Sequence, residues 1–475
     1  QLAPSNGEVS PSDAAKNKKL AISSVIGGFT YMMFPGSVYV TGVIAPFIKS
    51  YFALPPSSTL PQQILPFCLI IDIFSMPIGS YFTQKNVNPK LMIALGGVVA
   101  FTCLFGASCV GPDHYWLFFF LYTIAFGFNH GMCYMVPIHH GWLWYPNNMG
   151  LMSGIIIGGF GFGPLIFDNV ATAVINPEGA KADDDGYYPQ SVNDRFQTMM
   201  LVLVSSYFVL MLSGIALIFQ GPLKQVQAST SVAQTMPDEG SDENEEIAEE
   251  LALPDQSVLQ KAEREALLKQ EPLKSMVFSR PCMTIYIMNF ASTLSCFFPI
   301  NNVKFYGQKN GLENETYLAI VGSIGAFFNA IRFIWSFATD YYSYKLVYSI
   351  LLTIQIVLNF TMPFIASVPA LYAIWICGLL LCEGGHFTLV PNVLKKIYGS
   401  AGTQIYGFMF SYTCMSSLLQ IVVNTYVVTA TKESYNTLFM AFGTCSVLAL
   451  AMLHTVFKEE PYQPRSLKPR PIIKF

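Results

Sequence analysis

Several ionisable side chains interrupt long apolar segments of this sequence. Arg332, Glu383 and Asp72 carry charge, and His130 and His386 are histidines in similar surroundings. A guanidinium in an apolar segment can bind a carboxylate through two parallel hydrogen bonds, whereas a carboxyl or imidazole group can take up and release a proton. These residue types therefore indicate binding of an anion, with or without a proton.

Arg332 lies eight residues before Asp340, about 12 Å from the end of its expected helix. An arginine at the centre of a membrane costs about 2.5 to 3.5 kcal/mol on translocon scales, so it needs a compensating partner. Asn329 and Ser336 lie three residues before it and four after it, which gives an apolar helix one polar face. Two interpretations follow: Arg332 binds an anionic group of a substrate, or it is the structural partner of a carboxylate.

Charge counting leads to a hypothesis about the acids Asp72 and Glu383. If both are ionised beside Arg332, the core carries a net negative charge and opposes an anion; if both are protonated, it attracts one. We therefore expect Glu383 to take up a proton when the anion binds. The alternatives are that Glu383 is a fixed ion partner of Arg332, that Asp72 makes a structural hydrogen bond, and that His130 is a packing residue.

The composition is typical of a polytopic membrane protein. The chain has 475 residues, of which 52% are hydrophobic and 12% are charged, against about 25% charged in soluble domains. The net charge of −3 offers no basic field for nucleic acid. Apolar segments of about 20 residues fall at roughly 20-47, 62-83, 91-110, 115-138, 149-175, 197-220, 276-303, 317-340, 345-366, 370-394, 402-429 and 435-457.

These segments predict an all-α membrane protein of 12 transmembrane helices in two six-helix pseudo-repeats. The predicted divisions are an N-terminal tail (1-19), a six-helix bundle (20-220), an acidic, largely disordered linker (221-274), a second six-helix bundle (275-457) and a C-terminal tail (458-475). Lys and Arg are more frequent in the loops on the side of the two termini. Both termini are therefore expected on the cytoplasmic or matrix side, and plasma membrane and organelle inner membrane both remain open.

Glycines at four-residue spacing follow the fourth apolar segment. Gly150, Gly154 and Gly158 form one series, and Gly159 and Gly163 form another. Small residues at this spacing let a second helix backbone approach closely. Such a contact suits either a fixed helix pair or a surface on which two halves of the molecule rock.

The two halves also share a sequence pattern. The segment from Asn129 to Pro137 aligns with that from Glu383 to Pro391, and both keep a glycine and a Val-Pro pair. Two parallel repeats of six helices joined by a polar linker describe the major facilitator architecture, whose substrate site lies between the repeats near the bilayer midplane.

The motif Trp144-Tyr-Pro146 with the glycines that follow it resembles the signature of the oxalate/formate antiporter branch of the major facilitator superfamily, which is related to the monocarboxylate porters. Further matches occur at Asn329-Ala-Ile-Arg332, at Glu383 to Pro391 and at Tyr406-Gly407. The resemblance implies a transporter that works by alternating access. It also implies that Arg332 pairs with a substrate carboxylate.

The resemblance and the helical register suggest further site residues. Tyr39 and Tyr134 match tyrosines that line the family's cavity, and His386, Asn329, Tyr412 and Thr413 are expected beside them. Asp72, His130 and Glu383 are candidates for proton coupling. Residues expected in helix packing or gating are Gly79, Asp340 and the five glycines Gly150, Gly154, Gly158, Gly159 and Gly163.

Departures from the family pattern narrow the substrate and leave a second interpretation. Thr413 stands where oxalate-specific members have a lysine, which favours one carboxylate over two and therefore pyruvate, lactate or formate. Thr83 and Met149 replace residues of the usual gating motifs. These changes would also suit a transporter-derived structural subunit or receptor that lacks transport activity.

The sequence contains no nucleophile elbow, Walker loop, HExxH or zinc quartet, so we expect neither an enzyme nor a metal or other cofactor. The expected partners are a small organic anion, protons and the lipid bilayer. The chain would act as a monomer or, in the second interpretation, as a subunit of a larger membrane complex. Uniport, symport and exchange remain open.

Overall fold

The computed structural model describes residues 11–56, 58–183, 185–222, 264–312, 314–426 and 432–464. In these ranges the chain is helical and contains no strand. The predicted linker and the outermost parts of both tails lie mostly outside the described residues.

The N-terminal half contains α1 (Pro11–Gly36), η1 (Ser37–Val40), α2 (Thr41–Tyr51), η2 (Leu60–Gln63), α3 (Ile64–Gln84), α4 (Pro89–Ser108), α5 (Tyr115–Cys133), α6 (Met135–Trp144), α7 (Met149–Ile175), α8 (Gln190–Asn193) and α9 (Phe196–Leu217).

The C-terminal half begins with a short amphipathic segment and continues with a second set of long helices. Its elements are α13 (Leu273–Val277), α14 (Arg280–Lys309), α15 (Glu315–Ala330), α16 (Phe333–Tyr341), α17 (Tyr344–Ile365), α18 (Pro369–Tyr398), η3 (Gly399–Ala401), α19 (Gly402–Met409), α20 (Ser411–Tyr426) and α21 (Lys432–Thr455).

The long helices confirm the predicted twelve-helix fold. Among the described residues, 10 segments are long and apolar enough to cross a membrane. One of them, Pro369–Val423, contains both α18 and the α19–α20 helix. The 30-residue α14 adds one more helix of membrane length.

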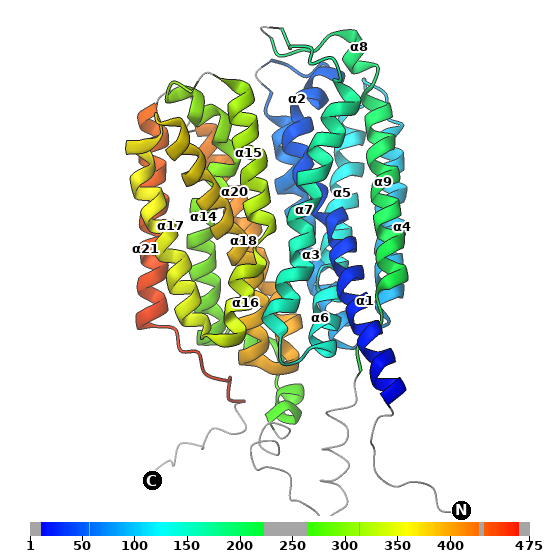
Figure 1. The fold of residues 1–475 in the computed structure, drawn as a ribbon, viewed down its shortest axis with the longest axis vertical. Coiled ribbons are helices and arrows are strands. Elements are labelled where there is room, and N and C mark those ends of the chain that lie inside the picture. The colour runs from blue at the N-terminus through cyan, green and yellow to red at the C-terminus, as the bar shows by residue number, and fades with distance from the viewer. Residues whose placement is uncertain are drawn as a thin grey trace, which may run out of the picture.

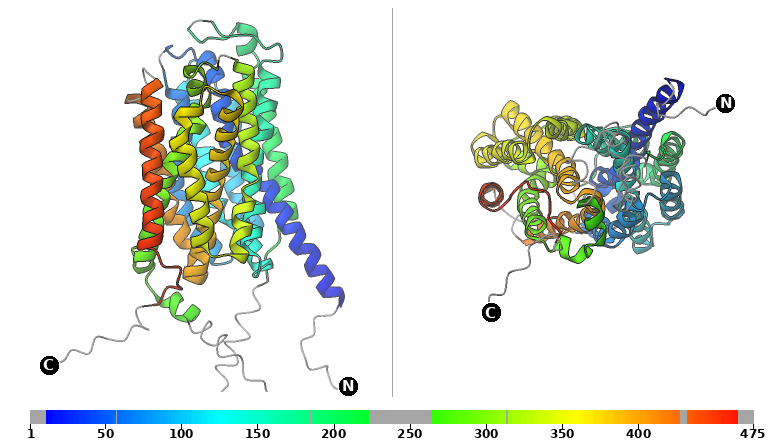
Figure 2. Two further views of the ribbon diagram at one scale, coloured as in Figure 1. Left: turned by 60° about the vertical axis from the view of Figure 1, so that its left-hand side comes forward. Right: turned by 90° about the horizontal axis from the view of Figure 1, so that it is seen from below.

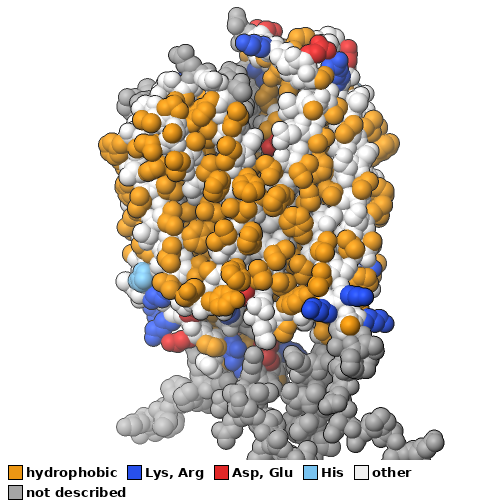
Figure 3. Space-filling model, in the orientation of Figure 1, with side chains coloured by type: hydrophobic (Ala, Val, Ile, Leu, Met, Phe, Trp, Pro, Cys, Tyr) orange, Lys and Arg blue, Asp and Glu red, His pale blue; other side chains and the backbone are white. Residues whose placement is uncertain are grey.

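The two halves stand side by side as bundles of nearly parallel helices (Figure 1). The start of α1 and the end of α21 lie at the same end of the molecule, which we call the terminal end. Figure 2 shows both bundles from the side and from this end. Hydrophobic side chains cover the middle of the face in Figure 3, whereas Lys, Arg, Asp and Glu gather towards its two ends. This distribution matches a hydrocarbon layer between two aqueous phases.

Four of the long helices are interrupted near the middle, where the sequence predicted continuous spans. The first span changes to the 3-10 turn η1 just after Pro35, and the fourth breaks at Tyr134 between α5 and α6. Proline explains both breaks: Pro35 and Pro137 lack the N–H that would bond to the carbonyl four residues earlier.

The other two breaks contain no proline. The eighth span breaks at Ile331 and Arg332, between α15 and α16, and the eleventh breaks at Phe410, between α19 and α20. Arg332 donates its backbone N–H to Asn329 O at 3.3 Å, a three-residue step that tightens the turn. All four breaks lie at or beside residues that line one cavity.

The halves touch mainly along two surfaces. On one, α7 packs against α15, α16 and α18; on the other, α3 packs against α19 and α20. Glycines on α7 make the first contact close: a Cβ added to Gly161 would lie 2.5 Å from Ala330 Cα, and one added to Gly154 would lie 2.6 Å from Phe333 Cα. The opposite face of α7 packs on α1, with Gly159 and Gly163 beside Phe29 and Met33.

Candidate functional site: a cavity between the two halves

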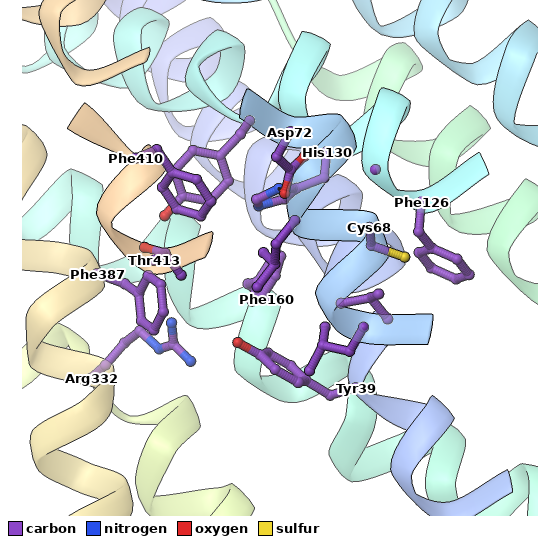
Figure 4. Close-up of a pocket in the computed structure, with 15 residues that line it drawn as sticks. Tyr39, Cys68, Asp72, Phe126, His130, Phe160, Arg332, Phe387, Phe410 and Thr413 are labelled. Atoms are coloured by element: carbon purple, nitrogen blue, oxygen red, sulfur yellow. Dashed lines mark hydrogen bonds and ion pairs between the residues drawn. The ribbon is translucent and has the colours of Figure 1, made fainter. Parts of the chain in front are cut away.

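Both halves line a small cavity near the level of the helix breaks (Figure 4). Its water-accessible volume is about 20 Å³, which is enough for one or two water molecules. Its lining residues are Val38, Tyr39, Leu65, Cys68, Leu69, Asp72, Phe126, Gly127, His130, Tyr134, Phe160, Arg332, Phe387, Phe410 and Thr413. The cavity is therefore mainly apolar and aromatic, with a few polar groups.

Arg332 reaches the cavity from the break between α15 and α16. Its side chain is only 2% exposed. Its Nε donates to the backbone oxygen of Asn329 at 2.9 Å, and its Nη2 donates to the Oδ1 of the same residue. Within the described residues the guanidinium has no carboxylate within 4 Å, so a buried positive charge faces the cavity without an ion pair.

Asn329 links Arg332 to Glu383. While its Oδ1 accepts from Arg332, its Nδ2 donates to Oε2 of Glu383 on α18. Glu383 is buried and does not line the cavity. α18 comes close because residue 384 is a glycine: a Cβ there would lie 2.6 Å from Arg332 Cβ. The acid is therefore coupled to Arg332 through an amide rather than through a direct salt bridge.

The N-terminal half supplies a second polar group. His130 on α5 and Asp72 on α3 both line the cavity, and His130 Nδ1 lies 2.9 Å from Asp72 Oδ2. Both side chains are buried. Among the described residues, His130 Nε2 and Asp72 Oδ1 have no hydrogen-bond partner.

Aromatic rings separate these two polar groups. Arg332 Cζ lies 6.0 Å from the ring centre of Phe160 and 5.7 Å from that of Phe387. The His130 ring lies 5.1 Å from Phe160 and 5.4 Å from Phe410. The sequence analysis missed these three phenylalanines. With 38 Phe in the chain, residue type alone could not identify them; the signal available was the aromatic residue inside the glycine series at position 160.

The structure brings some of the other predicted residues to the cavity. Tyr39, on η1, points its hydroxyl towards Arg332 in Figure 4. Tyr134 lines the cavity at the α5–α6 break, with its ring 4.8 Å from that of His130. Thr413 also lines it, and its Oγ1 has no hydrogen-bond partner among the described residues.

Tyr412 and His386 do not line this cavity. Tyr412 is buried beside Thr413, with its ring against Tyr286. His386 belongs to a polar network inside the C-terminal half: its Nε2 lies 2.9 Å from Gln355 Oε1, and its Nδ1 lies 3.2 Å from the Tyr348 hydroxyl. His386, three positions after Glu383, was expected to face the same cavity, but it packs against α17 and α14, whereas Glu383 contacts α15.

The residues predicted to serve packing or gating lie at contacts between helices. Asp340 accepts hydrogen bonds from the backbone N–H groups of Gly150 at 2.7 Å and Leu151 at 2.8 Å, which joins the two halves at the terminal end. Gly158 lies beside Ala330. Gly79 instead packs on Met132, so it serves the N-terminal half alone.

Further contacts close the terminal end below the cavity. Ser153 donates to Asn392 Oδ1 at 2.6 Å, and His139 Nδ1 lies 3.1 Å from Thr403 Oγ1. Each pair joins one half to the other. Within the described residues no group of three or more His, Cys, Asp or Glu side chains is placed to hold a metal ion.

Taken together, the site can bind a small anion. Arg332 provides the charge, Tyr39 adds a hydroxyl beside it, and the phenylalanines leave room for only one or two waters, which strengthens the electrostatic attraction. The residues come from both halves, so a relative movement of the halves would open or close the cavity.

Comparison with known proteins bears on this arrangement. Residues 20–452 match the family model described as Major Facilitator Superfamily. The chain is 26% identical over 364 residues to Apicoplast pyruvate carrier 1 of Toxoplasma gondii; the match includes 72% of this chain and 65% of that protein, so the chain spans less than two thirds of that relative's length. It is 24% identical over 387 residues to the Oxalate:formate antiporter of Oxalobacter formigenes, covering 81% and 79% of the two chains.

Solved structures agree on the fold. The proton:xylose symporter XylE bound to 6-bromo-6-deoxy-D-glucose superimposes with a TM-score of 0.61 at 15% identity, covering 94% of this chain and 98% of that one. A double Trp mutant of XylE gives a TM-score of 0.64, also at 15% identity, covering 95% and 98%.

Proposed function

Because this chain belongs to the major facilitator superfamily, a family of transporters, we propose that it carries a small monocarboxylate across a membrane by alternating access, with the substrate carboxylate on Arg332. The halves would rock about the cavity, with α7 as the main surface between them. In the structure the terminal end is closed.

One observation carries this proposal: a buried guanidinium faces a cavity between the halves and has no ion pair within the described residues. Glu383 reaches this charge only through Asn329, so among the described residues no carboxylate occupies the cavity side of the guanidinium, and an anion there would gain a direct ion pair. Arg332 is held by its own Asn329, which leaves part of its planar fork for a carboxylate.

The relatives support the same class of substrate. One is named for pyruvate and the other for oxalate and formate, and all three are small carboxylates. The cavity lining contains one arginine and no lysine, which favours a single carboxylate over two.

Proton coupling is a second part of the proposal. Glu383 is buried and shares Asn329 with Arg332. When an anion binds to Arg332, the site gains negative charge, and protonation of Glu383 would balance it. The carrier would then move a proton with its anion.

Uptake into proteoliposomes tests the function. Purified protein would be reconstituted and offered labelled formate, acetate, pyruvate, lactate and oxalate, with and without an inward proton gradient. We expect uptake of monocarboxylates above that of protein-free liposomes, with little uptake of oxalate and stimulation by the gradient. If folded protein takes up none of these anions, the proposal is wrong and the chain is better regarded as a non-transporting subunit or receptor.

A further inference from the structure

The cavity has a second polar pole opposite Arg332. In Figure 4, Arg332 and Tyr39 lie on one side of Phe160, and His130 and Asp72 lie on the other. The transport proposal assigns substrate binding to the first side. The second side contains buried polar atoms that have no hydrogen-bond partner among the described residues.

Three such atoms belong to residues that line the cavity. His130 Nε2, Asp72 Oδ1 and Thr413 Oγ1 are each buried and have no hydrogen-bond partner among the described residues. Burying a polar atom without a partner typically costs about 1 to 3 kcal/mol. The one or two waters for which the cavity has room, or a ligand that displaces them, would supply the missing partners. The three atoms come from three helices and both halves, which is typical of a binding site rather than of a local capping motif.

Asp72 fixes the direction in which His130 can act. Its Oδ2 lies 2.9 Å from His130 Nδ1, which holds the ring in one orientation; when Asp72 is ionised, Nδ1 carries the hydrogen of this bond. Nε2 is then left for the cavity. It can donate to a carbonyl oxygen if the ring is doubly protonated, or accept from a hydroxyl group if it is not.

The distance between the poles limits what can connect them. Phe160 touches both groups, with its ring centre 6.0 Å from Arg332 Cζ and 5.1 Å from the His130 ring. The two poles are therefore at most about 11 Å apart. A carboxylate carbon bound to arginine lies about 4 Å from Cζ, and an oxygen bound to Nε2 lies about 4 Å from the ring centre.

At most about 3 Å then remains between the carboxylate carbon and the second oxygen of a ligand that lies between the poles. An oxygen on the carbon next to the carboxylate is roughly 2.4 Å from the carboxylate carbon and fits this span. An extended longer chain between the two groups would not fit, so an oxygen on the second carbon is favoured. A second carboxylate would place its charge beside the Asp72 carboxyl group, so an uncharged oxygen is favoured.

We infer that His130, held by Asp72, recognises an oxo or hydroxyl oxygen on the second carbon of the substrate, so the carrier selects 2-oxo or 2-hydroxy monocarboxylates over simple fatty acids of the same size. This inference rests on the proposed function, because it presupposes that Arg332 binds the carboxylate. Thr413 lines the same cavity from the other half of the molecule.

The test compares pyruvate and lactate with propionate, which has three carbons but no oxygen on the second. Uptake efficiency for each would be measured with wild type, His130→Phe and Asp72→Asn. Wild type should favour pyruvate or lactate over propionate by about tenfold or more. His130→Phe should reduce this ratio towards one by lowering uptake of the oxygenated acids, and Asp72→Asn should reduce it less. Pyruvate and lactate measured separately show which oxygen is preferred.

His140→Gln is the matched control, because His140 is also buried but lies outside the cavity; its ratio should equal that of wild type. A thermal unfolding midpoint near that of wild type would show that each variant is folded.

Two results with His130→Phe would overturn the inference and assign His130 a structural role: an equal loss of uptake for all three acids, or an unchanged ratio of uptake efficiencies. A wild type that treats pyruvate, lactate and propionate alike would also overturn it while leaving monocarboxylate transport intact. Failure to transport any monocarboxylate would instead remove the proposed function.

Discussion

At the scale of single residues, the site is organised around how Arg332 is held. Asn329 accepts a hydrogen bond from the guanidinium of Arg332 and donates one to Glu383, so its side-chain amide links the cation to the carboxyl group. Sequence spacing predicted that Asn329 and Arg332 share a face. It did not predict the amide bridge, because that contact also depends on the approach of α18 at Gly384.

Glu383→Gln should remove the dependence of uptake on an imposed proton gradient. Glutamine resembles the protonated acid and keeps its shape, so the anion should still bind, but no proton can follow it. Uptake would be measured at a series of external pH values with the internal pH fixed. Asp194→Asn, at an exposed site far from the cavity, should behave as wild type. An unchanged gradient response in Glu383→Gln would exclude the proton-coupling proposal.

The difference between the two buried histidines illustrates what sequence alone could not provide. His130 and His386 both lie in apolar helices. Only the packing of neighbouring helices decides that one faces the cavity, whereas the other bonds to Gln355 and Tyr348. Helical periodicity gives the face of a residue, but the identity of the neighbour on that face depends on contacts between segments far apart in the chain.

At the scale of helices, α7 has the most specific role. One series of its glycines packs on α15 and α16 of the other half, and the other series packs on α1. The four-residue spacing predicted close contacts. The division between the two partners follows from where α7 lies, at the boundary between the halves.

Gly161→Val should strongly reduce transport. The added side chain would meet the backbone of Ala330, and overpacking typically costs about 1 to 3 kcal/mol, which corresponds to a change of roughly 5- to 150-fold in an equilibrium between conformations. Gly322→Val on α15 is the control, since a Cβ there meets no atom within 4 Å. Both would be tested for uptake and for thermal unfolding. If Gly161→Val transports as well as Gly322→Val, α7 is not the surface on which the halves move.

Asp340→Asn should open the terminal end more often. The carboxylate of Asp340 accepts from two N–H groups at the start of α7, and a charge at a helix N-terminus contributes about 0.3 to 2 kcal/mol. The corresponding position in the other half is Thr83, whose side chain donates, among the described residues, to Gly79 O of its own helix alone. The closed end therefore depends on one such carboxylate.

Electron–electron distance measurements between spin labels at positions 85 and 341, on exposed sites of the two halves, would test this expectation. Asp340→Asn should increase the fraction of long distances by about 2- to 30-fold. Distance distributions identical to those of the parent protein would show that Asp340 does not hold the terminal end closed.

At the scale of the whole molecule, the twelve-helix fold was the most predictable feature. Apolar segments of membrane length leave few alternatives, since the backbone must satisfy its hydrogen bonds within each helix. The mid-span breaks were less predictable. Pro35 and Pro137 indicate two of these breaks in the sequence. The breaks at Arg332 and Phe410 contain no proline and depend on tertiary contacts.

The start of α1 and the end of α21 lie at the same end of the molecule, which allows a test of orientation. We expect both termini on the cytoplasmic or matrix side, because Lys and Arg are more frequent on that side of the predicted spans. Epitope tags at either end should be hidden from antibody in sealed right-side-out vesicles and accessible after permeabilisation. A tag accessible in the sealed vesicles would show that the orientation is reversed.

The central claim is that Arg332 binds the substrate carboxylate, and uptake of labelled pyruvate by Arg332→Gln proteoliposomes tests it most directly. Glutamine keeps a polar side chain but removes the charge. Arg195→Gln is the control, because Arg195 lies outside the cavity and pairs with Glu178. The account predicts that Arg332→Gln protein with a normal unfolding midpoint loses uptake by 100-fold or more (about 3 kcal/mol), while Arg195→Gln retains it. Equal uptake by both variants would contradict the account.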